Sequence, residues 1–310
     1  MSNTAVAQRV PFSVMINKPN YQAMINRTIQ DPARARRFVS AIVSAVSVNQ
    51  ALQECTPQTV LSGALLGESL NLSPSPQLGQ YYLVPFENRK EGVKNAQFVL
   101  GYKGMIQLAL RSGQYKRLNV LAVKEGELLR WNPLTEEIDL HLIADDTLRE
   151  QTATIGYLAS FEYLNGFTKT IYWSKEKMIA HADRYSAAFS REATTGRYPK
   201  VSFADYEAHN YPQKDEWLYS SYWYKDFDGM AFKTMLRQLI SKWGIMSIDM
   251  QAAISDDGAV ITHVTANGEF LHAEETPEAA LPEPEDQQDK PQEVSEASAQ
   301  AESQIGLNDV

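Results

Sequence analysis

Two strand-like segments joined by a polar, basic turn place the strongest limit on the fold of this chain. Near residue 80 the apolar residues change from helical spacing to the pattern of strands, over Gln80 to Phe86 and again over Ala96 to Tyr102. The polar residues 87–95 between these segments are typical of a turn, so the two strands are expected to pair. We therefore predict an α+β fold with a central antiparallel β-sheet and hairpin core flanked by helices.

Helix start signals surround this core. Asp31-Pro32 can cap and begin a helix whose apolar residues, from Phe38 to Val46, repeat at helical spacing. Thr56-Pro57 repeats the signal for a second helix, and a third is expected from about Asp226 to Trp243. Ser174 can cap a fourth helix, and residues 105–111 favour a short one. Further strands are expected over 116–124, 137–143, 153–163 and 169–173.

Composition divides the chain into three parts. Residues 1–12 are expected to form a flexible leader, and residues 13–272 a folded domain. Within the domain, the irregular segment 184–225 is rich in aromatic residues; it is either a loop that becomes ordered on a ligand or another copy, or a solvent-exposed insertion. Residues 273–310 are rich in Glu, Pro, Gln, Ala and Ser and lack aromatic residues, so we predict a disordered acidic tail.

The formal net charge of −9 conceals regions of opposite sign. The tail holds eleven acidic residues and one basic residue, which leaves 28 basic and 27 acidic residues in the rest of the chain. Between Arg89 and Arg130, nine basic residues stand against three acidic ones. The acidity belongs to the tail, and the basic centre of the folded part is compatible with binding to nucleic acid.

Motifs that the sequence lacks exclude several classes of protein. There is no Gly-x-x-x-x-Gly-Lys-Ser/Thr loop for ATP, no dinucleotide-binding glycine motif and no nucleophile elbow. The single cysteine, Cys55, and five scattered histidines give neither a disulfide framework nor metal-ligand spacing. No signal peptide or membrane-spanning stretch is visible, so we expect a cytoplasmic protein without a cofactor, although Mg²⁺ is compatible with the sequence.

Paired carboxylates keep a metal-dependent nuclease open as an alternative. Glu125 and Glu127 are close in sequence, as are Asp145 and Asp146, and a few carboxylates around Mg²⁺ can support hydrolysis of a phosphodiester. A solvated strand end and a solvated turn explain the same residues without any chemistry. A second alternative is a self-assembling phage structural protein whose basic segment contacts another protomer.

The hairpin, its basic turn and the helix that follows combine the residue types that single-stranded nucleic acid requires. Lysine and arginine side chains can follow the phosphates, and the rings of Tyr81, Tyr82 and Tyr102 can stack on bases whatever the base sequence. The same three tyrosines also fit positions in the core or on the strand surface. Residue types alone leave both interpretations open.

Five ordered blocks resemble the successive motifs of the RecT family of phage single-strand DNA-annealing recombinases. They span about residues 58–243: Leu70–Pro74, Gly79–Phe86, Gly101–Gly104 with Arg111–Gly113, Val123–Gly126 and Asp226–Arg237. The resemblance implies the fold of the annealing recombinases and a protein that is not an enzyme. Such a protein binds single-stranded DNA and anneals it to its complementary strand without ATP, in homologous recombination. The resemblance also implies a ring or helical filament of copies and a partner 5′→3′ exonuclease. For the acidic tail three roles stay open: docking of the exonuclease or of the host single-strand-binding protein, shielding of the basic groove, and a purely solubilising role.

Carried over residue by residue, the resemblance gives five first-rank candidates for contact with DNA: Tyr102, Lys103, Arg111, Lys233 and Arg237. Lys233 and Arg237 are four residues apart and share one helix face, which alternatively is the solvated edge of a buried helix. The chain departs from the family pattern at Gly229, where alanine is usual, and at Phe232, where a polar residue is common. A second set is chosen by charge alone: Arg89, Lys90, Lys94, Lys116, Arg117 and Lys124.

The predicted mechanism needs no reading of bases by the protein. Cations hold the phosphates of one strand and leave its bases open, so that pairing with the incoming strand supplies both the specificity and the free energy. Neighbouring copies hold successive stretches of the strand in register.

Overall fold

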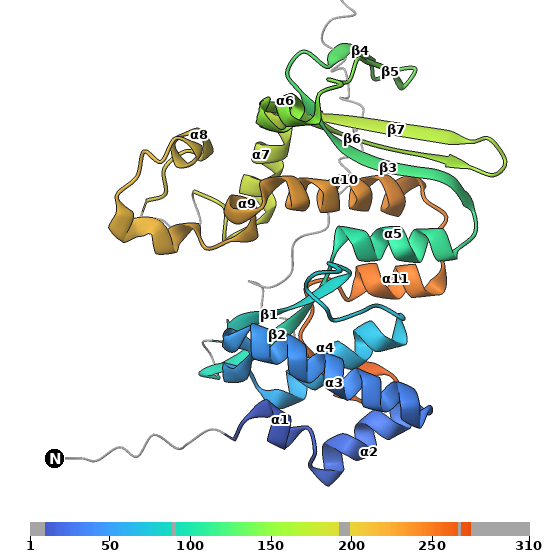
Figure 1. Ribbon diagram of the computed structural model, residues 1–310, viewed down its shortest axis with the longest axis vertical. Coiled ribbons are helices and arrows are strands. Elements are labelled where there is room, and N and C mark those ends of the chain that lie inside the picture. Colours follow the sequence, from blue (N-terminus) through green and yellow to red (C-terminus); the bar gives the residue numbers. More distant parts are fainter. Residues whose placement is uncertain (1–9, 89–90, 192–198, 266–267, 274–310) are drawn as a thin grey trace, which may run out of the picture.

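The computed structural model describes residues 10–88, 91–191, 199–265 and 268–273. Two lobes are connected through a pair of stacked helices, and a separate aromatic segment extends from one side (Figure 1). The elements are helices and antiparallel strand pairs, which confirms the predicted α+β class. None of the described helices is long and apolar enough to cross a lipid bilayer.

Helices and one hairpin form the first lobe. The hairpin pairs β1 (Tyr81–Asn88) with β2 (Val93–Leu100), and α4 packs against it through a fully buried apolar face. The helices that precede the hairpin are α1 (Phe12–Met15), α2 (Pro19–Thr28), α3 (Pro32–Val48), the 3₁₀ helix η1 (Gln50–Glu54) and α4 (Pro57–Ser69).

Residues 258–272 complete the first lobe. Phe98 in β2 accepts a hydrogen bond from the Gly258 N–H at 2.8 Å and donates its own N–H to the Ala259 carbonyl at 2.9 Å. The short strands β8 (Ile261–Val264) and β9 (Phe270–His272) follow this contact, and β8 packs on α4. Residues distant in sequence from the hairpin therefore extend it on its outer edge.

A three-stranded antiparallel sheet in the order β3-β6-β7 forms the second lobe. Tyr157, Ala159 and Phe161 alternate along β6 and are buried beside α10, whose Met235 and Leu239 are fully enclosed. Helix α7 also covers the sheet. The elements of this lobe are β3 (Tyr115–Lys124), β4 (Leu128–Asn132), β5 (Glu137–Leu140), α6 (Asp146–Gln151), β6 (Thr154–Tyr163), β7 (Thr168–Ser174), α7 (Lys175–Tyr185) and α10 (Phe227–Trp243).

Two helices lie between the lobes. Helix α5 (Tyr102–Arg111) continues directly from β2 and packs against both α10 and α11 (Ile248–Ser255). Figure 1 shows α5 and α11 stacked below α10. The course of the chain from the hairpin into α5, and from α10 into α11, therefore couples the positions of the two lobes.

The aromatic segment carries only short helices, α8 (Phe203–Glu207), η3 (Gln213–Tyr219) and α9 (Tyr222–Lys225). Its rings nevertheless pack together, with Phe203 and Phe227 at 4.6 Å and Phe189 and Tyr224 at 4.7 Å between ring centroids. Because Phe189, Phe203 and Tyr224 are buried, the alternative of a solvent-exposed insertion is wrong for these rings. Aromatic contacts take the place of the periodic pattern that the sequence lacks.

Helix starts agree with the sequence more closely than strand ends do. The Asp31 carboxylate accepts hydrogen bonds from Ala33 and Arg34 at the start of α3, as expected for a cap. Helix α4 does begin after Thr56, but the Thr56 hydroxyl donates to the Lys94 carbonyl and does not cap the helix. The β1–β2 turn is shorter than the predicted 87–95, because both strands extend into it and Glu87 pairs with Lys94.

Several other predicted bounds were wrong. Helix α1 begins at Phe12, which is buried, within the expected leader, and β5 ends at Leu140. The sequence analysis predicted none of α1, α2, α6, α11, β4, β8 and β9. Residues 1–9 of the predicted leader and 274–310 of the predicted tail lie outside the described residues.

Candidate nucleic-acid interface

Two glycines bring the start of α5 against the start of β1. A Cβ atom on Gly101 or on Gly104 would lie 2.1 Å from a backbone oxygen, that of Gly79 or of Gln80 respectively. The Gly101 N–H donates to the Gln80 carbonyl at 2.9 Å, so the contact is also hydrogen-bonded. The strand therefore ends before Tyr102, and α5 begins there, earlier than predicted.

Three tyrosines from three elements gather at this point; with Lys103 they form what we call the tyrosine surface: Tyr82, Tyr102, Lys103 and Tyr222. The Tyr82 and Tyr222 rings lie 6.5 Å apart between centroids, and their side chains are 37% and 56% exposed. Partial burial, together with nearby Tyr222, the Asp226 carboxylate and Tyr102, raises the pKa of the Tyr82 hydroxyl. The Tyr102 ring packs edge-on against Phe232 of α10, with centroids 5.7 Å apart.

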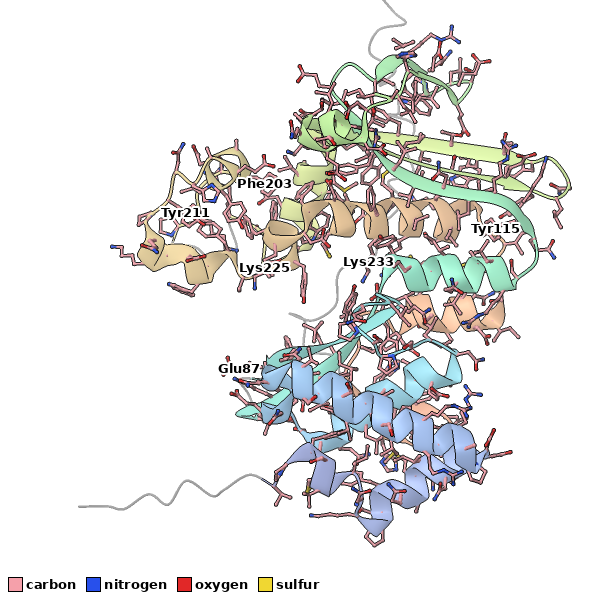
Figure 2. The ribbon with its side chains drawn as sticks, viewed as in Figure 1. Glu87, Tyr115, Phe203, Tyr211, Lys225 and Lys233 are labelled. Carbon is pink, nitrogen blue, oxygen red and sulfur yellow. The ribbon has the colours of Figure 1, made fainter. Side chains whose placement is uncertain are left out.

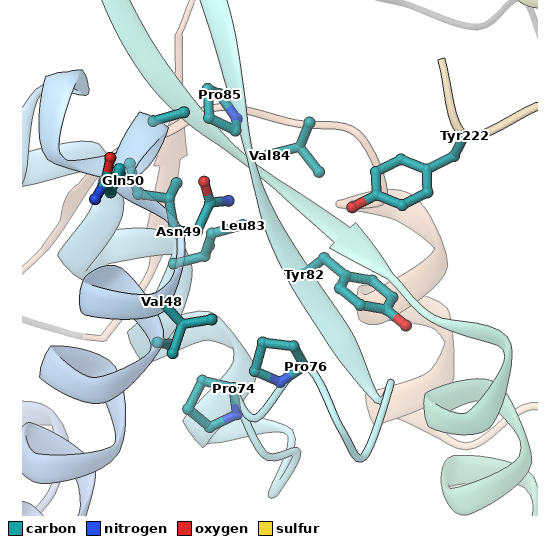
Figure 3. Close-up of a pocket in the computed structure, with 13 residues that line it drawn as sticks. Val48, Asn49, Gln50, Pro74, Pro76, Tyr82, Leu83, Val84, Pro85 and Tyr222 are labelled. Atoms are coloured by element: carbon teal, nitrogen blue, oxygen red, sulfur yellow. The ribbon is translucent and has the colours of Figure 1, made fainter. Parts of the chain in front are cut away.

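A pocket of about 620 Å³ adjoins Tyr82 and Tyr222. Its wall consists of β1 residues 82–85, the end of α3, η1, Pro74 and Pro76, and Figure 3 shows Tyr82 and Tyr222 on one side of β1 with the helix end on the other. None of the described residues that line it is charged. Such a wall is suited to a flat, uncharged group such as a nucleobase and not to a phosphate.

Lys103 supplies an accessible cation beside these rings. Its side chain is exposed, its Nζ lies 6.0 Å from the centre of the Tyr102 ring, and it forms no ion pair with any residue that the structure describes. Lys225, at the end of α9, is also exposed (Figure 2). The surface thus combines flat rings with positive charge, the two features that sequence-independent binding of single strands uses.

Lys233 and Arg237 are held by a buried carboxylate. The Asp257 side chain is only 2% exposed and accepts hydrogen bonds at 2.8 Å from both the Lys233 Nζ and the Arg237 Nη1. It also accepts from the Leu100 N–H at 2.9 Å. We call this group the Asp257 node. It links α10, the end of β2 and the segment after α11, so Lys233 and Arg237 have a structural partner within the fold.

Arg111 has a similar structural partner. Its guanidinium donates to the carbonyl oxygens of Leu70 and Asn71, each at 2.6 Å, at the end of α4. Arg34 donates to the Glu68 carbonyl in the same turn, at 2.8 Å. Two arginines therefore satisfy the free carbonyls at this helix end and complement its dipole.

The candidates chosen by charge do not gather on the tyrosine surface. Lys94 pairs with Glu54, and Lys116 and Arg117 both pair with Glu162. Lys124 donates to the Thr154 hydroxyl at 3.0 Å. Arg89 and Lys90 lie outside the described residues.

Two carboxylates of the nuclease alternative, Glu127 and Asp145, are held by partners within the fold. Glu127 is fully buried; its oxygens accept from Arg149 at 2.6 and 3.2 Å and from the N–H groups of Lys124 and Ile143. Burial opposes its ionisation, but these donors outweigh burial and lower the pKa of Glu127. Asp145 caps α6. Within the described ranges, no group of three or more metal-ligating side chains is present.

Sequence reasoning missed three residues of this site. Tyr222 lies in the segment without periodicity, and Asp257 carries no motif. Asp226 was considered as a helix start and as the first residue of a motif block, but not as part of the site. Only the abundance of tyrosine near Asp226 could have drawn attention to Tyr222. The partners of Asp257 lie 20 or more residues away along the chain, a separation that hides the contact from any local pattern.

Comparison with known proteins agrees with the motifs. The RecT family model matches residues 36–269. The uncharacterized protein YqaK of Bacillus subtilis is 36% identical over 263 residues, covering 83% of this chain and 78% of YqaK. Protein RecT of Escherichia coli is 34% identical over 114 residues, covering 36% of this chain and 42% of that protein. The chain therefore belongs to the RecT family, which assigns it a general role in DNA recombination and strand annealing.

Proposed function

We propose that this protein binds a single DNA strand along the tyrosine surface and anneals it to its complement without ATP. The observation that supports this function best is the grouping of Tyr82, Tyr102 and Tyr222 around the accessible cation Lys103. Rings there stack on bases of any identity, and lysine holds the neighbouring phosphate. The closure of new base pairs supplies the driving free energy.

The first-rank residues divide into two groups in this proposal. Tyr102 and Lys103 contact the strand directly, together with Tyr82 and Tyr222. Arg111, Lys233 and Arg237 position the surface, because each is hydrogen-bonded within the fold. The second-rank cations, Lys94, Lys116, Arg117 and Lys124 with Arg89 and Lys90, raise the local concentration of DNA through long-range attraction.

Family membership also supports a proposal about the wider activity. We infer that the protein is not an enzyme, acts in the cytoplasm, and assembles into a ring or filament on the strand. A 5′→3′ exonuclease supplies the single strand, and the host single-strand-binding protein is a second candidate partner. The acidic segment 273–310 is a candidate docking site for either of them.

An annealing assay tests the proposal directly. Two complementary oligonucleotides are added one after the other, with and without protein, in the absence of any nucleotide cofactor, and duplex is followed on a gel. We expect duplex to form faster with protein and no shortened products to appear with Mg²⁺. Shortened products would support the nuclease alternative, and failure to bind a 50-mer would favour the structural-protein alternative.

Substitutions at the surface assign the contact. Tyr82→Leu and Tyr222→Leu should each weaken single-strand binding by about 1–3 kcal/mol if the ring stacks on a base. Tyr21→Leu, on α2 and outside the surface, is the matched control. Lys103→Gln should lower the slope of log affinity against log salt by about 0.7, and Lys18→Gln should not. Equal effects of the surface and control substitutions would contradict the assignment.

A further inference from the structure

Six large apolar side chains are exposed together at one end of the molecule. They belong to the turn between β6 and β7, to the end of α10, to the segment between α10 and α11, to the start of α11 and to the end of α5, which meet on the right in Figure 1. Their exposed fractions run from 46% to 84%. We call them the end patch: Leu110, Leu164, Phe167, Trp243, Ile245 and Ile248.

Hydrogen bonds and ring contacts join Phe167, Trp243 and Ile245 of the end patch through Tyr163. The Tyr163 hydroxyl donates to the Trp243 carbonyl at 3.1 Å and accepts from the Ile245 N–H at 2.5 Å. The Phe167 ring stacks on the Tyr163 ring at 5.9 Å between centroids. Single exposed apolar residues are ordinary on protein surfaces, but a group of them gathered on one side of a molecule is typical of an interaction site.

On the opposite side of the molecule one large aromatic side chain is exposed. Trp217, in η3, is 59% exposed, although it lies within a segment whose other rings are mostly buried. Figure 2 shows Tyr211 and Tyr115 on opposite sides of the molecule. The Tyr211 ring lies 4.7 Å from the ring of Tyr219 in η3, between centroids, and so marks the side of Trp217. The Tyr115 hydroxyl donates a hydrogen bond to the carbonyl of Ile245 in the end patch. The 17 residues of α10 separate the two ends, a length of about 25 Å at 1.5 Å per residue.

Charge distinguishes the two ends as well. Near the end patch the basic side chains outnumber the acidic ones, Glu136, Glu162 and Asp249: they are Arg111, Lys116, Arg117 and Lys169. Around Trp217 the acidic side chains outnumber the basic ones, Lys175 and Lys214: they are Asp205, Glu207, Asp215 and Glu216. Opposite charge on the two surfaces favours contact between unlike ends and disfavours contact between like ends.

We propose that the end patch of one copy receives the Trp217 end of the next copy. The contact is therefore head-to-tail, and a pair of copies keeps one end patch and one Trp217 end that contact no other copy. Such a contact repeats without limit unless its rotation closes a ring. This inference refines the self-assembly in the proposed function by naming its surfaces and its polarity.

Two charge-introducing variants test the polarity of the contact. Ile248→Lys disables the end patch and Trp217→Lys disables the other surface, and both sites are exposed, so the fold should survive. Each variant alone should sediment as a monomer where the unaltered protein forms larger species. Mixed in equal amounts, they should form a complex of two copies and nothing larger, because only one pair of intact surfaces is left.

Controls separate loss of contact from loss of fold. Leu148→Lys, on α6 and outside both surfaces, should assemble like the unaltered protein. A second pair, Leu164→Lys and Glu216→Arg, should repeat the result of the first. Substitution of a central tryptophan in an interface typically costs about 30-fold or more in affinity, so Trp217→Ser should weaken assembly by at least that factor.

The outcomes are distinct from those that test DNA binding. Both monomeric variants should bind a 15-nucleotide strand as tightly as the unaltered protein, because the tyrosine surface is unchanged. If the unaltered protein does not bind the strand, the proposed function is overturned, and sedimentation still decides whether the head-to-tail contact exists. The head-to-tail contact is overturned if the mixture stays monomeric, if Trp217→Lys assembles normally, or if the unaltered protein is monomeric with and without DNA.

Discussion

Replacing Asp257 by asparagine distinguishes a positioning role for Lys233 and Arg237 from a direct role in holding phosphates. The substitution preserves the size of the side chain and an oxygen for the Leu100 N–H, and it removes the charge that both cations share. Two cations, of which Lys233 is 14% exposed, then lose their counter-charge in a largely enclosed site. Removing one partner of a buried ion pair typically costs about 3–5 kcal/mol.

The loss of stability should be readily measured. Arg237 keeps some access to water, so we expect the free energy of unfolding to fall by about 2–4 kcal/mol. For a folded part of this size, that corresponds to a melting temperature lower by roughly 5–15 °C. A triple variant, Asp257→Asn with Lys233→Met and Arg237→Met, should recover part of the loss, because it removes the unpaired charges.

The two roles predict opposite changes in DNA binding. If the node positions α10 against β2 and α5, Asp257→Asn should weaken binding of a single strand measured by fluorescence anisotropy. If Lys233 and Arg237 contact phosphates and Asp257 merely competes, the same variant should bind more tightly. Its salt dependence should also be steeper, by about 0.7 for each cation set free. Tighter, more salt-dependent binding with unchanged stability would refute the positioning role.

Three further predictions concern other parts of the molecule. Gly104→Ala should lower the free energy of unfolding by at least about 2 kcal/mol and reduce annealing, because the new Cβ would meet the Gln80 carbonyl. Gly92 faces open space but has a positive φ, so Gly92→Ala should lower the free energy of unfolding less, as measured by denaturant. Burial, with the charges of Lys177 and Arg184, lowers the pKa of His181 to about 4, below the ordinary 6.5. As pH falls from about 6.5 to 4, His181 is therefore protonated in the unfolded chain before it is protonated in the folded one. The free energy of unfolding should fall by about 1–3 kcal/mol over that pH window. This loss should be smaller in His181→Phe and unchanged in the control His209→Phe. Deletion of residues 273–310 should leave annealing intact; its complete loss would mean that the folded domain ends later than predicted.

Local chemistry explains what the sequence predicted well. The Asp31 and Ser174 side chains cap helices within a few residues of themselves, and the alternation along Thr154–Tyr163 matches a strand with one buried face. Gly101–Gly104 was noticed as a motif, and its glycines turn out to allow close backbone contact with β1. Each of these features depends on neighbours in sequence or on a requirement for one residue type.

Contacts between distant residues explain what the sequence did not predict. Charge alone cannot tell an accessible lysine, Lys103, from one held by a buried carboxylate, Lys233, because Asp257 lies in another segment. Tyr222 reaches Tyr82 only through the packing of the aromatic segment, which has no periodicity to detect. The Gly229 departure from the family pattern has a local reason, since a Cβ there would lie 2.2 Å from the Asp226 carboxylate that caps α10.

Photocrosslinking measures the position of the strand most directly. A single strand with 5-iododeoxyuridine at every thymidine position is bound to the protein, irradiated, digested and sequenced by mass spectrometry. We predict crosslinks at Tyr82, Tyr222 or Tyr102, and their loss when the matching tyrosine is changed to leucine. Crosslinks confined to rings outside the tyrosine surface, such as Tyr21 or Tyr185, would contradict the claim that this surface holds the DNA.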